Sequence, residues 1–280
     1  MRIRTVIMVA VAAVSSLASL RMSAKDDLQV RDSVLTVPAS VRKIASYAFK
    51  DRTDIARVEF EAPSSLSEIG EYAFIGCANL REIRLPQSLM KLGEGSFREC
   101  SSLTFVDIPR DVAALPKYLF AWCEALKRVD LPRRLADIGS GCFAYCKSLS
   151  EISFPPALTH IGANAFSFCS SLEKVVLPNR IAELESYAFS ECISLREVTL
   201  PANDRLLGEL IFSGCRSLRT ITELSVNPPK FDCNSTLFEE NEKYMYDLCE
   251  LRVPMQSQLR YRKAPAWRLF RNIEGVRLKL

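Results

Sequence analysis

The chain of 280 residues is long enough for one large domain or two ordinary ones, and its 48% apolar and 25% charged residues are typical of a folded globular protein. This composition excludes a disordered or collagen-like chain. The 37 basic and 33 acidic residues leave a net charge of +4, which is too small to indicate nucleic-acid binding by itself. The single histidine, His160, argues against most metal sites and most Ser–His or Cys–His catalysts.

The first 24 residues have the pattern of a signal peptide. A basic start, Met1–Arg4, precedes the uncharged segment Thr5–Leu20, which is shorter than a membrane span but has the length of a signal-peptide core. Cleavage is expected after Ala18 or Ala24, and a buried helix or a short anchor are the alternatives. Removal of residues 1–24 leaves 34 basic and 33 acidic residues, a net charge of +1. We predict an exported protein, at the cell surface, in the periplasm or secreted, that does not span a membrane after cleavage.

The most informative feature is a repeat of 23 residues, anchored on a phenylalanine. The first step between anchors is 25 residues and the next six are 23 residues each. A cysteine lies three residues after seven of the eight anchors, and a leucine lies six residues after the same seven. The anchors are Phe49, Phe74, Phe97, Phe120, Phe143, Phe166, Phe189 and Phe212. The cysteine column is Cys77, Cys100, Cys123, Cys146, Cys169, Cys192 and Cys215.

Each repeat combines a short strand with a turn. In Leu80-x-x-Ile83-x-Leu85 the apolar residues alternate, which predicts a strand, and Pro86 ends it because proline has no N–H to donate. One unit of 23 residues cannot bury its own apolar positions, whereas stacked units can. We therefore predict a repeat solenoid of about eight coils over residues 25–224, built from short parallel strands and turns.

Residues 225–280 depart from the repeat and are predicted to form a C-terminal cap. The segment Leu251-x-Val253-Pro254 has the pattern of one more strand. Further on, Trp267, Phe270 and Ile273 lie at helical spacing, within the segment that begins at Tyr261.

The unit Ile-Gly-x-x-Ala-Phe-x-x-Cys-x-x-Leu-x-x-Ile-x-Leu-Pro, present at residues 69–86, resembles that of the BspA-type leucine-rich repeat proteins of bacterial surfaces, as found in Bacteroidetes. The closing pattern of residues 227–273 also resembles the cap of many members. The resemblance implies a leucine-rich repeat solenoid that acts in adhesion or protein–protein interaction, with a host or microbial surface protein as partner. It supplies no catalytic residues and no cofactor.

The cysteine column is interpreted as buried packing. Its spacing is that of the repeat, unlike the closely spaced cysteine pairs of zinc sites, and neighbouring side chains in a stack point in parallel, which is poor disulfide geometry. Disulfides within the column remain an alternative. A bridge between Cys233 and Cys249, both outside the column, is left open. No metal site is expected.

Two groups of outward residues are candidates for partner binding. On the strands, Phe105, Arg128 and Val176 lie among alternating charges, and the alternative there is a solvated charge ladder. The second group, two residues after the anchor, is described below as the ring stack and consists of Trp122, Tyr145 and Phe168.

Other coils carry glycine or an acid at the position of the ring stack, so we expect its rings to be partly exposed. The simplest interpretation is a surface ladder without a ligand. The functional interpretations are a protein-binding anchor or, alternatively, a glycan-binding platform. Together these features predict a non-enzymatic protein with no catalytic role for His160 and no nucleic-acid partner.

Overall fold

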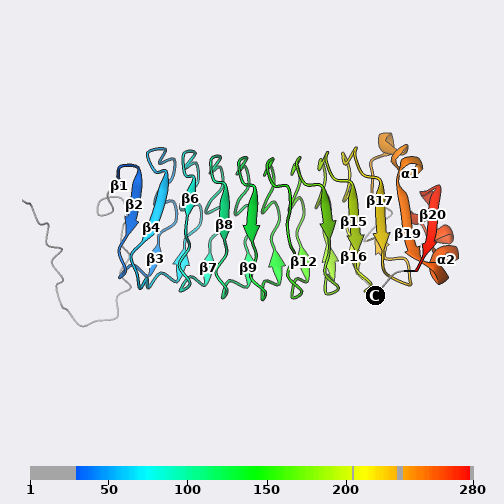
Figure 1. The fold of residues 1–280 in the computed structure, drawn as a ribbon, viewed down its shortest axis with the longest axis horizontal. Coiled ribbons are helices and arrows are strands. Elements are labelled where there is room, and N and C mark those ends of the chain that lie inside the picture. Colours follow the sequence, from blue (N-terminus) through cyan, green and yellow to red (C-terminus); the bar gives the residue numbers. More distant parts are fainter. Residues whose placement is uncertain (1–29, 204, 232–235, 278–280) are drawn as a thin grey trace, which may run out of the picture.

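The computed structural model describes residues 30–203, 205–231 and 236–277. The predicted signal peptide and Cys233 lie outside these ranges. The chain forms an elongated solenoid, in which successive strands lie side by side from β1 at one end to β20 at the other (Figure 1). Among the described residues, no helix is long and apolar enough to cross a membrane.

The strands predicted from the alternating apolar residues form one wide sheet, which is divided into two blocks. The first block is β1 (Val30–Arg31), β2 (Val34–Val37), β4 (Arg57–Phe60), β6 (Glu82–Ile83), β8 (Phe105–Asp107) and β10 (Arg128–Asp130). The second block is β13 (Lys174–Val176), β15 (Glu197–Leu200), β17 (Thr220–Glu223), β19 (Glu250–Pro254) and β20 (Asn272–Val276). From β2 onward the pairing is parallel, and Phe105 is the partner of Arg128, one repeat later.

The wide sheet is interrupted in the coil between β10 and β13. In that coil Phe154 takes the position that a smaller aliphatic residue occupies in its neighbours, such as Leu131 and Leu177. The Phe154 ring is only partly buried and meets the anchor Phe166 edge-on, with the ring centroids 5.6 Å apart. The larger ring at this position coincides with the loss of regular pairing.

A second, narrow sheet of two-residue strands runs along the opposite edge of the solenoid and is also divided into two blocks (Figure 1). The first block is β3 (Lys43–Ile44), β5 (Glu68–Ile69) and β7 (Lys91–Leu92). The second block is β9 (Ala114–Leu115), β11 (Asp137–Ile138), β12 (His160–Ile161), β14 (Glu183–Leu184), β16 (Leu206–Leu207) and β18 (Lys230–Phe231). In each of the eight strands from β3 to β16 of this sheet, the second residue is a buried Ile or Leu and the first points outward, so the column of first residues lines this edge.

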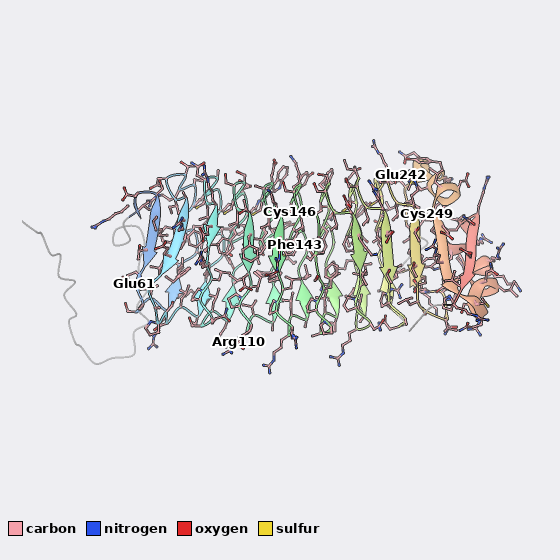
Figure 2. All side chains as sticks on the ribbon, in the orientation of Figure 1. Glu61, Arg110, Phe143, Cys146, Glu242 and Cys249 are labelled. Atoms are coloured by element: carbon pink, nitrogen blue, oxygen red, sulfur yellow. The ribbon has the colours of Figure 1, made fainter. Side chains whose placement is uncertain are left out.

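The eight anchor phenylalanines fill the interior as one continuous stack. Successive ring centroids are 5.0 to 6.1 Å apart, with interplanar angles of 6° to 20°. Every anchor ring is at most 1% exposed. Figure 2 shows Phe143 inside the solenoid, whereas Arg110 lies at the edge opposite Glu242. This stack confirms that each coil packs on its copy in the next coil.

The two ends of the solenoid are closed differently. At the N-terminal end β1 turns back and pairs antiparallel with β2. At the C-terminal end the chain forms the 3-10 helix η1 (Glu240–Glu242) and the helix α1 (Met245–Leu248) before it returns to the sheet as β19.

The segment expected at helical spacing from Tyr261 to Ile273 is not one helix. It contains α2 (Gln258–Lys263), which follows η2 (Met255–Ser257), then η3 (Trp267–Leu269), and it ends in β20. Pro265 and the positive φ of Ala266, 60°, end the helical geometry between α2 and η3. Ile273 then pairs with Leu251 of β19, so the cap also extends the wide sheet.

Candidate functional site

Two positions in every coil have left-handed backbone geometry, and they flank the anchor. At both positions φ lies between 52° and 75° in all eight coils. Two residues before the anchor stand Tyr47, Tyr72, Gly95, Tyr118, Gly141, Asn164, Tyr187 and Leu210. Two residues after it stand Asp51, Gly76, Glu99, Trp122, Tyr145, Phe168, Glu191 and Gly214. Glycine adopts this geometry without strain, which explains the glycines in both columns, whereas bulky side chains are unusual in it.

The ring stack occupies this second column in three consecutive coils. The ring centroids of Trp122 and Tyr145 are 3.8 Å apart, and those of Tyr145 and Phe168 are 4.3 Å apart. Both pairs have an interplanar angle of 6°. Trp122 is 38% exposed and Phe168 is 37% exposed, while Tyr145 between them is half-buried. The expected partial exposure is confirmed, and the rings cover one another's faces.

The backbone beneath the ring stack is held by hydrogen bonds to the next coil. The N–H of Trp122 donates to the carbonyl of Ala144 at 2.8 Å, and the N–H of Tyr145 donates to Ser167 in the same way at 2.8 Å. Rotation of the backbone at these residues would break the contacts between coils. The rings therefore stand on a fixed backbone, and only their side-chain torsions remain to be ordered on binding.

The sheet-face candidates do not form a single cluster. The guanidinium of Arg128 lies 5.7 Å from the ring centroid of Phe105, which is 43% exposed, and Asp130 accepts two hydrogen bonds from Arg128 at 2.8 and 2.9 Å. Val176, 51% exposed, belongs to the second block of the wide sheet, beyond the interruption at Phe154. The structure thus brings Phe105 and Arg128 together but does not pair Val176 with them.

The charges on the wide sheet pair as in the charge ladder that was the alternative to a partner surface. Pairs between neighbouring coils join Arg57 to Glu82 at 3.3 Å and Lys174 to Glu197 at 2.8 Å. Arg84 pairs with Glu82 within the same strand region at 2.9 Å. Such exposed pairs contribute about 0–1 kcal/mol each. Most of this face is therefore a solvated charged surface, and Phe105 is its exposed aromatic ring.

Sequence reasoning missed the aromatic residues of the first left-handed column. Tyr47 and Tyr72 stack at 5.3 Å, and the guanidinium of Arg98 lies 6.0 Å from the ring of Tyr118. Tyr118 is 41% exposed. The signal was available in the sequence, because four of the eight coils carry tyrosine two residues before the anchor.

The cysteine column is buried, as expected, and it also makes a hydrogen bond that the sequence did not indicate. Each thiol is at most 2% exposed and donates to the backbone carbonyl of the anchor phenylalanine in the preceding coil, at 3.1 to 3.3 Å. Burial raises the pKa of the Cys77 thiol to about 12 and that of Cys146 well above its usual range. The described column thiols are free. Cys249 is a buried, free cysteine, and Cys233, the other partner of the bridge left open above, lies outside the described residues.

The sequence of the coils matches the family model for the BspA type leucine rich repeat region, in six copies, over residues 32–124 and 113–227. The chain belongs to the BspA-type leucine-rich repeat family. No curated protein matches the chain in sequence. Two of the solved structures that match the chain illustrate the shared fold.

A leucine-rich repeat protein from Bacteroides ovatus is 24% identical, with a TM-score of 0.57, over 79% of this chain and 68% of that one. A leucine rich cell surface protein from Faecalibacterium prausnitzii is 21% identical, with a TM-score of 0.50, over 88% of this chain and 79% of that one. At these identities the similarity shows the leucine-rich repeat fold alone and says nothing about the outward residues of each coil. The surface of this chain must therefore be interpreted from its own residues.

Proposed function

We propose that this BspA-type protein is an exported, non-enzymatic interaction protein that binds a protein partner through the ring stack. One observation carries the proposal. Three consecutive coils place an aromatic side chain at a left-handed, solvent-facing position where the other coils have glycine or an acid. Bulky residues are disfavoured in this geometry, so the aromatic residues call for a compensating contribution, in their stacking or in binding.

The geometry of the ring stack favours a protein over a glycan. A sugar stacks on the open face of an aromatic ring, but both faces of Tyr145 are covered by its neighbours, at 3.8 and 4.3 Å. Trp122 and Phe168 are partly exposed, and the outer face of each is not covered by another ring of the stack. Edges and end faces suit side chains of a protein surface, where Trp and Tyr are common binding anchors. A glycan-binding platform remains the second candidate because two end faces are available.

The scaffold supports this role energetically. The rings stand on backbone that is fixed between coils, so a partner does not have to order a loop when it binds. The sheet face around Phe105 and Arg128 is a second candidate surface, and it forms a separate aromatic–cation contact. The proposal of export depends on the signal-peptide pattern of residues 1–24. The proposal of adhesion or another surface role depends on membership in the family.

The experiment compares matched variants of the mature chain as bait for cell-surface protein extracts. The triple variant Trp122→Ser, Tyr145→Ser, Phe168→Ser removes the ring stack. Tyr118→Ser is the control, since Tyr118 is similarly exposed, at 41%, in the other left-handed column. A partner identified with the unmodified chain should bind the triple variant about 30-fold or more weaker, equivalent to about 2 kcal/mol, and bind the control normally.

Two outcomes would contradict the proposal. Unchanged binding by the triple variant, together with loss in Phe105→Ser, would move the site to the wide sheet. Binding to a defined glycan that disappears in Trp122→Ser, without any protein partner, would establish the glycan alternative. Export is tested by N-terminal sequencing of the native protein, which should begin after Ala18 or Ala24, and an intact Met1 would contradict it.

A further inference from the structure

His160 lies on the narrow sheet, at the edge of the solenoid where β12 is labelled in Figure 1. The parallel pairing places it between Asp137 of β11 and Glu183 of β14. Its Nδ1 is 3.1 Å from Oδ2 of Asp137, and its Nε2 is 2.9 Å from Oε1 of Glu185. The imidazole is 25% exposed, so solvent ions can reach it.

Glu185 is an exception to the repeat. Five of the eight coils have glycine at its position, four residues before the anchor, because the backbone of the preceding coil passes close by. A Cβ added to Gly208, for example, would lie 2.2 Å from the backbone nitrogen of Ser186. Glu185 is tolerated with its carboxylate turned toward the coil of His160, where Oε2 accepts the N–H of Ala163 at 2.6 Å. Its side chain is thereby held beside the only imidazole in the protein.

The result is an excess of negative charge around one histidine. Elsewhere on this edge the acid Glu68 lies between two cations, Lys43 at 3.0 Å and Lys91 at 3.5 Å. In the described part of the chain, His160 is the only cation within ion-pair distance of Asp137 or Glu185, and Glu183 adds a third carboxylate. Even a protonated His160 leaves this group of residues with a net negative charge.

Three of these side chains have potential ligand atoms that lie close together. One ligand atom each from His160, Glu183 and Glu185 can be chosen so that all lie within 4.8 Å of one another. Glu183 and Glu185 also line a pocket of about 230 Å³ that extends toward Leu206 and Gly208. The pocket leaves room for water or another small ligand beside the carboxylates.

We propose that His160, Glu183 and Glu185 form a binding site for a divalent transition-metal ion of the zinc type. Zinc accepts histidine nitrogen and carboxylate oxygen at about 2.0–2.2 Å, which places tetrahedral ligand atoms about 3.3–3.5 Å apart. The three ligand atoms already lie within 4.8 Å of one another, so each pair would have to close by at most about 1.5 Å to reach that separation. The fourth position, on the pocket side, would be taken by water. Metal is bound by Nε2, while Asp137 accepts the Nδ1–H and orients the ring, as carboxylates commonly do for metal-binding histidines.

A proton and the metal compete for Nε2. Burial lowers the pKa of His160, but the hydrogen bond that the protonated imidazole donates to Glu185 and the charges of Asp137 and Glu185 outweigh it and raise the pKa above its ordinary value. Protonated His160 cannot bind metal.

The experiment measures binding of Zn²⁺ to the folded, chelator-treated full chain by equilibrium dialysis, with thermal unfolding as a second measurement. His160→Lys keeps a cation in the ladder, as at Lys43 and Lys91, but removes the ligand. Glu185→Gly restores the residue most common at that position. Both variants should fold and lose stoichiometric binding. Asp137→Asn should weaken binding about 10–100-fold, as for other residues that orient a metal ligand. Glu68→Gln, at the distant acid of the same edge, is the control and should bind like the unmodified chain.

The expected result is one Zn²⁺ per unmodified chain and an increase in its melting temperature with Zn²⁺ concentration, absent in His160→Lys and Glu185→Gly. Absence of binding to the unmodified chain would overturn the proposal. Equal binding to the folded Glu185→Gly and His160→Lys variants would also overturn it, because the metal would then be held by other groups, such as thiols.

Discussion

The side-chain carboxylate of Glu242 accepts a hydrogen bond from the backbone N–H of Gly214 at 2.9 Å. In the preceding coils the N–H at this left-handed position donates to a backbone carbonyl of the next coil, as Glu191 does to Ser213. Gly214 belongs to the last Phe-anchored coil, and Glu242 from η1 supplies the missing acceptor. Its second oxygen accepts the hydroxyl of Ser213 at 3.1 Å. Glu242 lies on the cap in Figure 2, so one carboxylate ends a ladder that runs through the whole solenoid.

We expect Glu242→Ala to lower the free energy of unfolding by about 1–3 kcal/mol, because the buried N–H of Gly214 loses its partner. Glu242→Gln should lower the free energy of unfolding much less, since its amide oxygen can still accept the hydrogen bond from Gly214. Urea unfolding followed by circular dichroism measures both. An equal decrease of the free energy of unfolding in the two variants would show that the charge of Glu242, and not its hydrogen bond, stabilises the cap.

The cap is also fixed by a buried ion pair. The guanidinium of Arg205 donates to the carboxylate of Glu223, and both side chains are 0% exposed. The other Glu223 oxygen accepts the N–H of Ser225 at 3.0 Å, and the hydroxyl of Tyr261 donates to the carbonyl of Ser225 at 2.9 Å. This chain of contacts joins the last coils to α2.

Removing one partner of this ion pair should destabilise the protein far more than replacing both. Glu223→Ala leaves the Arg205 charge buried and unpaired, and we expect it to lower the free energy of unfolding by about 3–5 kcal/mol. The double variant Arg205→Met, Glu223→Leu should recover most of that loss because it leaves no buried charge. Urea unfolding of the unmodified chain, Glu223→Ala and the double variant gives the comparison. A double variant as unstable as Glu223→Ala would contradict the prediction.

The repeat columns made much of the fold predictable from the sequence. Phe143 recurs in register with its copies, and a residue repeated at 23-residue intervals has one place to pack in a solenoid. Partial exposure of Trp122 followed from the glycine and acids at its position. The cap was less predictable, because Ile273 at helical spacing pairs with Leu251 instead, and a long-range strand pairing leaves no local period in the sequence.

The surroundings of His160 show a second limit to what can be predicted from the sequence. The sequence places Glu185 where most coils have glycine, and this departure was visible without a structure. What the sequence alone did not show is that the carboxylate turns toward the preceding coil, since that depends on the close approach of Ala163. Departures from a repeat consensus were therefore a better guide to candidate sites than the type of residue alone.

His160 should make stability depend on pH in the metal-free protein. Its pKa is raised above 6.5 in the folded state, because Glu185 and Asp137 outweigh the effect of burial. Its contribution to the free energy of unfolding is therefore complete below the unfolded pKa of 6.5, and it is lost as the pH rises through the folded pKa. The comparison is between the unmodified chain and His160→Gln, by urea unfolding with chelator present. The stability advantage of the unmodified chain should be greatest in acid and shrink as the pH rises above 6.5, and a constant difference would contradict this.

The cysteine column should behave as packing, with Cys146 as the test position. Cys146→Ala removes a buried sulfur and its hydrogen bond to the carbonyl of Phe120, which still accepts the N–H of Cys123 at 3.1 Å. We therefore expect a loss of about 1 kcal/mol or slightly more for Ala. Cys146→Asp should lose several kcal/mol, because it buries an unpaired carboxylate among apolar side chains.

The raised pKa of Cys146 also keeps its thiol neutral at ordinary pH, and only the thiolate reacts quickly. Alkylation by iodoacetamide at about pH 8, followed by mass spectrometry, should leave the column thiols unmodified in the native protein and modify them after denaturation. Rapid native alkylation of Cys146 would contradict burial, and resistance after denaturation without reductant would reveal disulfides in the column. Each thiol donates a hydrogen bond to the preceding coil. All column thiols should therefore lose their protection from alkylation together when the solenoid unfolds.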